Sequence, residues 1–84
     1  MNRNEEIMTI LQEECAELIQ AVSKVKRFGM SENHKHLVLE LCDLQCIMEL
    51  LYEYGVVHCS TEDKLNMIFE KREKLKKFSN IFLK

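Results

Sequence analysis

Residues 7–25, IMTILQEECAELIQAVSKV, decide the fold. Apolar side chains recur in this segment at steps of three and four residues, which is the period of an amphipathic α-helix. The pattern extends over residues 4–26 and stops before Gly29, a residue type that often ends a helix. The apolar stripe of this first helix consists of Ile7, Ile10, Leu11, Leu18, Ala21, Val22 and Val25.

Two further helices follow from the same pattern. Residues 33–54 carry a second apolar stripe and stop at Gly55. A third helix is expected to start after Ser60 or Thr61, either of which can cap it, and residues 79–84 to trail off as a flexible tail. The second stripe consists of Leu37, Leu41, Leu44, Ile47, Met48, Leu51 and Tyr52, and the sparser third one of Leu65, Ile68, Phe69, Leu75 and Phe78.

The composition agrees with a single all-α domain over residues 1–84. The chain is 46% hydrophobic and 31% charged, with two glycines and no proline, which suits long uninterrupted helices. We expect two long antiparallel helices and a shorter third one, which form an incomplete bundle. Pairing of two chains would complete a four-helix core, so we expect a homodimer or a dimer of dimers.

The sequence also predicts the environment of the protein. No apolar run approaches the length of a membrane span and no signal region is visible, so we expect a soluble, cytoplasmic protein without a membrane partner. The four cysteines (Cys15, Cys42, Cys46 and Cys59) are then interpreted as reduced, core-filling thiols. A structural zinc site is the less favoured alternative, because Cys42 and Cys46 lack a second pair at finger-like spacing.

The net charge of −2 conceals an uneven distribution. Residues 1–69 carry six Lys or Arg and twelve Asp or Glu, whereas residues 70–84 carry six and two. An acidic body with a basic tail could bind a cation and a polyanion side by side. The simpler alternative is a solvated helix end, where basic residues are also favoured. No sequence-reading nucleic-acid motif is present, and we expect no specific nucleic-acid partner.

Acidic residues occupy positions that the helical pattern reserves for core side chains. Glu14 falls inside the first apolar stripe, with Glu17 at its edge. Glu40 interrupts the second stripe, with Asp43 beside it. Each pair has the spacing i and i+3, so its members lie on one face of a helix, and the two pairs would meet when the helices pack.

Burying several carboxylates together is unfavourable unless a positive group lies among them. Lys24, Lys26 and Arg27 lie one to two turns too far along the first helix to neutralise both pairs. Divalent cations prefer carboxylate oxygens, so we predict one or two Mg²⁺ ions, with Mn²⁺ as a substitute. The open alternatives are that these acids are ordinary surface residues or partners of Lys and Arg across a dimer interface.

The segments EECAE (13–17) and ELCD (40–43) resemble the EExxE and ExxD signature of the MazG-like and phosphoribosyl-ATP pyrophosphohydrolase superfamily. The 22 residues between the two segments are also similar to that family's spacing. The resemblance extends from residue 5 to about residue 80 and is strongest to the small versions found in bacteriophages. It implies an all-α enzyme that uses Mg²⁺ to cleave a (deoxy)nucleoside triphosphate between the α and β phosphates, giving a monophosphate and pyrophosphate.

The resemblance also implies roles for individual residues. Glu14, Glu17, Glu40 and Asp43 would be the metal ligands, and Glu13 would join Glu14 and Glu17 as a catalytic residue, either as a base or in support of the ligands. Cationic side chains would hold the leaving pyrophosphate. The candidates for substrate binding are Lys71, Lys74 and, more weakly, Asn80.

Other functions fit the sequence less well. An oxygen-activating dimetal bundle would require Glu-x-x-His motifs, and no Glu here has a His at the third following position. A non-catalytic helical dimer or partner-binding module remains the alternative; it predicts no metal dependence and tolerance of Glu14→Gln. The histidines His34, His36 and His58 are interpreted as surface residues without a catalytic role.

Overall fold

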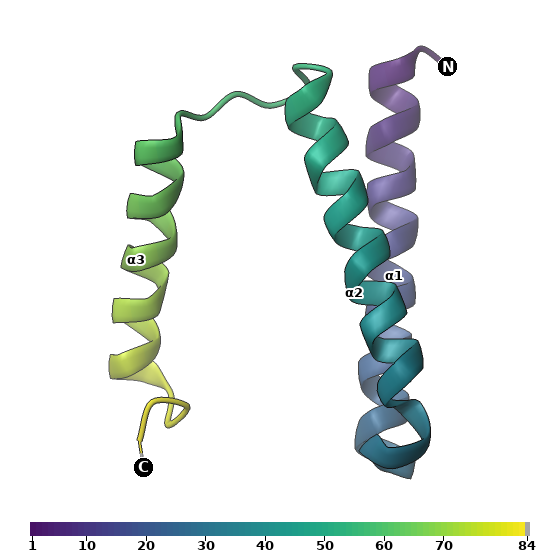
Figure 1. Cartoon of the computed structure of the whole chain (residues 1–84), viewed down its shortest axis with the longest axis vertical. Helices are drawn as coiled ribbons and strands as arrows, with labels where there is room; N and C mark the ends of the chain where they lie inside the picture. Colours follow the sequence, from purple (N-terminus) through teal and green to yellow (C-terminus); the bar gives the residue numbers. More distant parts are fainter. Residues whose placement is uncertain (84) are drawn as a thin grey trace.

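The computed structural model describes residues 1–83 as three α-helices with no strand: α1 (Arg3–Phe28), α2 (Met30–Glu53) and α3 (Thr61–Phe78). The helices α1 and α2 pack side by side as an antiparallel hairpin, and an extended segment then leads to α3, which stands apart from the hairpin (Figure 1). The predicted all-α class is therefore confirmed. Lys84, the last residue of the predicted tail, lies outside the described residues.

Polar side chains fix the ends of the helices. The Asn2 side chain caps α1, where its Oδ1 accepts a hydrogen bond of 2.8 Å from the backbone N–H of Glu5. Ser60 caps α3 in the same way, accepting from the N–H of Asp63 at 3.1 Å, so Ser60 and not Thr61 is the cap. The helix ends at Phe78, and the Ser79 hydroxyl donates to the carbonyl of Leu75 at 2.6 Å.

The connection between α1 and α2 is shorter than the sequence pattern suggested. We expected the second helix to begin near residue 33, but α2 begins at Met30, directly after Gly29. Gly29 has φ +96° and ψ 161°, a conformation essentially restricted to glycine, which lets the chain reverse at one residue. The side-chain amide of Asn33 donates to the Gly29 carbonyl at 2.9 Å and supports this turn.

The hydrophobic core of a single chain is small. The buried apolar residues are Ile7, Ala21, Ile47 and Leu51. Other members of the predicted second stripe, including Leu41, Met48 and Tyr52, are exposed, so their expected burial is wrong for one chain. The reason is geometric: α1 covers one side of α2, and the apolar stripe is wider than one neighbouring helix can cover.

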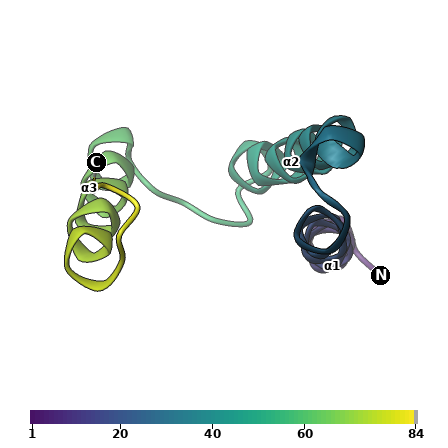
Figure 2. The same ribbon diagram turned by 90° about the horizontal axis from the view of Figure 1, so that it is seen from below.

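The helix α3 contributes nothing to this core. Its backbone stands apart from α1 and α2 within residues 1–83, as Figure 2 also shows, and its side-chain contact with the hairpin is that of Lys64 with the Tyr52 ring, at 4.7 Å from the ring centre. The radius of gyration is 15.7 Å, against about 12 Å for a compact domain of this length. The accessible surface is 7157 Å², against about 5,200 Å² for a compact monomer of this mass. The single chain therefore leaves a large surface uncovered.

The cysteines do not fill the core as expected. All four are free; Cys15, Cys42 and Cys46 are exposed, and Cys59 is half-buried. The interpretation as core-filling residues is wrong for the three exposed thiols, because they lie on helix faces that the neighbouring helix does not cover.

Among the described residues, no helix combines the length and apolar character that crossing a bilayer requires.

Candidate metal centre

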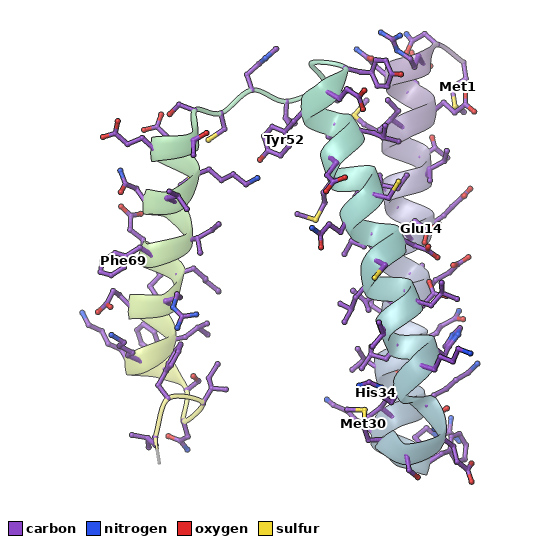
Figure 3. All side chains as sticks on the ribbon, in the orientation of Figure 1. Met1, Glu14, Met30, His34, Tyr52 and Phe69 are labelled. Carbon is purple, nitrogen blue, oxygen red and sulfur yellow. The ribbon has the colours of Figure 1, made fainter. Side chains whose placement is uncertain are left out.

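Three acidic side chains meet in the middle of the α1–α2 hairpin. Glu14 projects from the central part of α1, and Glu40 and Asp43 from the central part of α2 (Figure 3, which labels Glu14). Each offers one carboxylate oxygen, and these oxygens all lie within 4.8 Å of one another. We call Glu14, Glu40 and Asp43 the acid cluster.

Two oxygens of the acid cluster are buried without any hydrogen-bond partner. Glu40 is only 6% exposed, and Glu14 is half-buried. The Oε2 atoms of both residues are inaccessible to solvent and accept no hydrogen bond. Buried polar atoms in folded proteins are almost always paired, because leaving them unpaired costs free energy. A proton or a cation at this position would satisfy both oxygens.

The electrostatics of the acid cluster also favour a proton or a cation beside these carboxylates. Burial raises the pKa of Glu14 above its ordinary value of 4.5, and the negative charges of Glu17 and Asp43 raise it further. Burial also raises the pKa of Glu40, followed by the charge of Glu17, whereas His36 acts in the opposite direction. Within residues 1–83, no Lys or Arg forms an ion pair with these acids.

The donor set suits a hard divalent cation. Around an octahedral Mg²⁺ with bonds of about 2.0–2.1 Å, ligand oxygens lie about 3 Å apart when adjacent and about 4 Å apart when opposite. The spacing in the acid cluster, within 4.8 Å, requires only small side-chain movements to reach that geometry. Three carboxylates also leave coordination positions for water or phosphate oxygens, as Mg²⁺ prefers.

The remaining predicted acids lie at the margin of the site. Glu17 is exposed and does not belong to the acid cluster, yet its charge acts on both Glu14 and Glu40, so it lies close by. Glu13 is exposed and affects Glu14 least among the neighbouring acids. The structure thus brings together three of the four predicted ligands and leaves Glu17 beside them.

One neighbour of the site was not anticipated. His36 is a surface residue, as expected, with its side chain 46% exposed, but its Nε2 lies 3.7 Å from Oε1 of Glu40. It is the only side chain of the described range that forms an ion pair with the acid cluster when protonated. The i, i+4 spacing between His36 and Glu40 was the available signal in the sequence.

The predicted substrate-binding residues lie away from the acid cluster in a single chain. Lys71 and Lys74 are exposed on α3, whose backbone stands apart from the hairpin, and Asn80 follows that helix. A separate groove of about 500 Å³ runs along α2 next to the start of α3. Its walls include Leu41, Leu44, Met48, Tyr52 and Lys64.

Comparison with known protein families, with characterised proteins and with solved structures finds no match to this chain. The chemistry of the site therefore rests on its own residues and geometry.

Proposed function

We propose that this protein is a Mg²⁺-dependent pyrophosphohydrolase that cleaves a (deoxy)nucleoside triphosphate between its α and β phosphates. The observation that carries the proposal is the acid cluster, with one unpartnered buried oxygen on Glu14 and one on Glu40. The order and spacing of EECAE and ELCD, which resemble the MazG-like signature, support the same reaction.

In this proposal, Glu14, Glu40 and Asp43 hold the cation, with Glu17 as a further ligand at the edge of the site. Bound Mg²⁺, or Mn²⁺ in its place, would offset the charge of the phosphates and lower the pKa of the attacking water. Glu13 lies next to this position in the chain and is the candidate base. Because Glu40 is buried, its carboxylate is held in place before substrate arrives, which favours catalysis.

We further propose that the protein acts as a cytoplasmic homodimer. Residues 1–83 bury four apolar side chains, a small core that association with a second chain would enlarge. A second chain could cover the exposed residues of α2 and complete a four-helix core.

A non-catalytic binding module is the second candidate. The specific observation in its favour is α3, whose apolar residues Leu65, Ile68 and Phe69 are all at least half exposed. Such a helix could bind another protein without any chemistry at the acids. This candidate predicts no metal dependence, so the following experiment separates the two functions.

The test is pyrophosphate release from a panel of ribo- and deoxyribonucleoside triphosphates, with Mg²⁺ or with EDTA. The wild type is compared with Glu40→Gln and with the control Glu53→Gln, which changes an exposed acid at the end of α2. We expect turnover that needs Mg²⁺, is lost in Glu40→Gln and is kept in Glu53→Gln. Absence of turnover on every nucleotide, with folded protein, would favour the binding module.

A further inference from the structure

Two helix faces lie opposite each other across the groove and meet at the start of α3. Tyr52 points from α2 towards α3 (Figure 3), and the Lys64 ammonium lies 4.7 Å from the centre of its ring. Ile68, Lys71 and Leu75 follow Lys64 at steps of four, three and four residues, so they share its side of α3. This side of α3 therefore faces the hairpin, although beyond the contact of Lys64 with Tyr52 the two backbones stand apart.

The uncovered area is large enough for a stable interface. The accessible surface exceeds that of a compact monomer by about 2,000 Å², the difference between 7157 Å² and about 5,200 Å². A typical protein–protein interface buries about 800 Å² on each partner. The groove walls include exposed apolar side chains on α2, such as Leu41 (47%) and Met48 (45%), which would gain most from being covered.

We propose that a second copy of this chain occupies the groove with its own hairpin, so that α3 of each chain packs across the hairpin of the other. In this arrangement Lys71 of each chain serves the acid cluster of the partner subunit, where it binds the phosphates of the nucleotide. The role of Lys71 rests on the function proposed above, whereas the exchanged position of α3 does not.

Charge favours a second copy as the occupant. Residues 1–69 carry six more acidic than basic side chains, and residues 70–84 carry four more basic than acidic ones. The basic end of α3 is thus complementary to the acidic hairpin of another identical chain. Because the acid cluster has no Lys or Arg partner among residues 1–83 of its own chain, the exchange would supply the cationic side chain that the phosphates need beside the cluster.

Lys71 and the acid cluster lie at similar levels along their helices. Glu14 and Glu40 lie near the middle of α1 and α2, and Lys71 lies near the middle of α3, which runs back alongside α2 (Figure 1). A two-fold axis parallel to the helices leaves the level of every residue unchanged. A two-fold axis perpendicular to the helices at their middle also keeps the centre of α3 level with the centre of the partner hairpin. Lys71 therefore remains level with the partner's acid cluster.

The interface is tested by light scattering and sedimentation of the full chain without nucleotide. The wild type is expected to have twice the mass of one 10.0 kDa chain. Met48→Glu in the groove and Ile68→Glu on α3 should each raise the dimer dissociation constant at least about tenfold, since each places a charge in an apolar interface. Asn66→Glu, on the other side of α3, should not. Circular dichroism checks that each variant is helical.

A monomeric wild type would overturn the proposal, as would a dimer that Ile68→Glu does not weaken. The latter result would mean that α3 folds against its own hairpin or remains free. Neither result depends on whether a nucleotide is hydrolysed, so failure of the interface is distinguishable from failure of the proposed function.

The exchanged role of Lys71 is tested by subunit complementation. Glu40→Gln and Lys71→Ala chains, each expected to lose at least about a hundredfold of activity alone, are unfolded together and refolded. Half of the dimers are then mixed, and each mixed dimer holds one site with both residues intact, so about a quarter of wild-type activity should return. No recovery, with mixed dimers detected by mass spectrometry, would overturn the exchange. Lys77→Ala, on another side of α3, should remain active.

Discussion

Glu14 of α1 and Glu40 of α2 lie together inside the hairpin, and each retains a buried carboxylate oxygen with no hydrogen-bond partner. The same burial that isolates these oxygens raises the pKa of both residues. A protein that needed only stability would gain by replacing them with apolar side chains. Their presence at the centre of so small a core is the basis of our proposal that they bind a cation.

Divalent cations should stabilise the folded protein. At a Mg²⁺ concentration about a hundredfold above the dissociation constant, binding adds about 2.7 kcal/mol to the free energy of unfolding, or roughly 10 °C or more in Tm for a domain of this size. Thermal unfolding followed by circular dichroism, with EDTA or with increasing Mg²⁺, measures the effect. Asp43→Asn should abolish it; an equal rise in Tm for this variant would place the cation elsewhere.

Without metal, stability should decrease as the pH rises. Because the pKa values of Glu14 and Glu40 are raised in the folded state, the folded protein binds more protons than the unfolded chain. The free energy of unfolding therefore falls between the ordinary pKa of 4.5 and the raised values of the folded state. Urea unfolding in EDTA at pH 5 and pH 7.5 tests whether the free energy of unfolding falls as the pH rises. Glu40→Gln should flatten the dependence, and an unchanged slope would contradict this account.

His36 should support the site without being essential. Its Nε2 lies 3.7 Å from Glu40 Oε1, close enough to influence the orientation of that carboxylate. Residues that orient metal ligands typically contribute about 10- to 100-fold to metal affinity or activity, so His36→Ala should weaken Mg²⁺ binding by about tenfold. Calorimetric titration measures this. His34→Ala is the matched control; if both variants bind like the wild type, the contact has no functional role.

Substitution of Gly29 should destabilise the fold because of its backbone conformation. No atom lies within 4 Å of the position that a Cβ would occupy, yet its φ of +96° and ψ of 161° are strained for any other residue. Gly29→Ala should therefore cost about 1–3 kcal/mol in the free energy of unfolding. Gly55, with φ +68°, lies close to the left-handed helical region that Asn tolerates, so Gly55→Asn should cost less. Equal costs in urea unfolding would argue against this explanation.

The helical period was sufficient to predict the three helices, because Leu, Ile and Val recur at turn spacing and Ser60 offers a cap. It did not predict the one-residue connection at Gly29, since the glycine conformation that allows it leaves no mark on neighbouring residues. Nor could it predict that Leu41 and Met48 would be exposed. An apolar stripe indicates that a face needs covering, and it does not say whether the same chain covers it.

The acid cluster was predictable from the apolar stripes. Glu14 and Glu40 interrupt apolar stripes, and the packing of two antiparallel helices then brings them together with Asp43. The positions of Lys71 and Lys74 could not be predicted, because they depend on where α3 lies and not on its period. The contact of His36 with Glu40 was also missed, although their spacing was visible in the sequence.

The central claim, that the acid cluster supports cleavage between the α and β phosphates, is tested most directly by ³¹P NMR of a reacting nucleoside triphosphate with Mg²⁺. The account predicts that the wild type produces nucleoside monophosphate and pyrophosphate in equal amounts, and that Glu40→Gln leaves the triphosphate intact. An unchanged triphosphate with folded wild type, or formation of a diphosphate and orthophosphate, would contradict it.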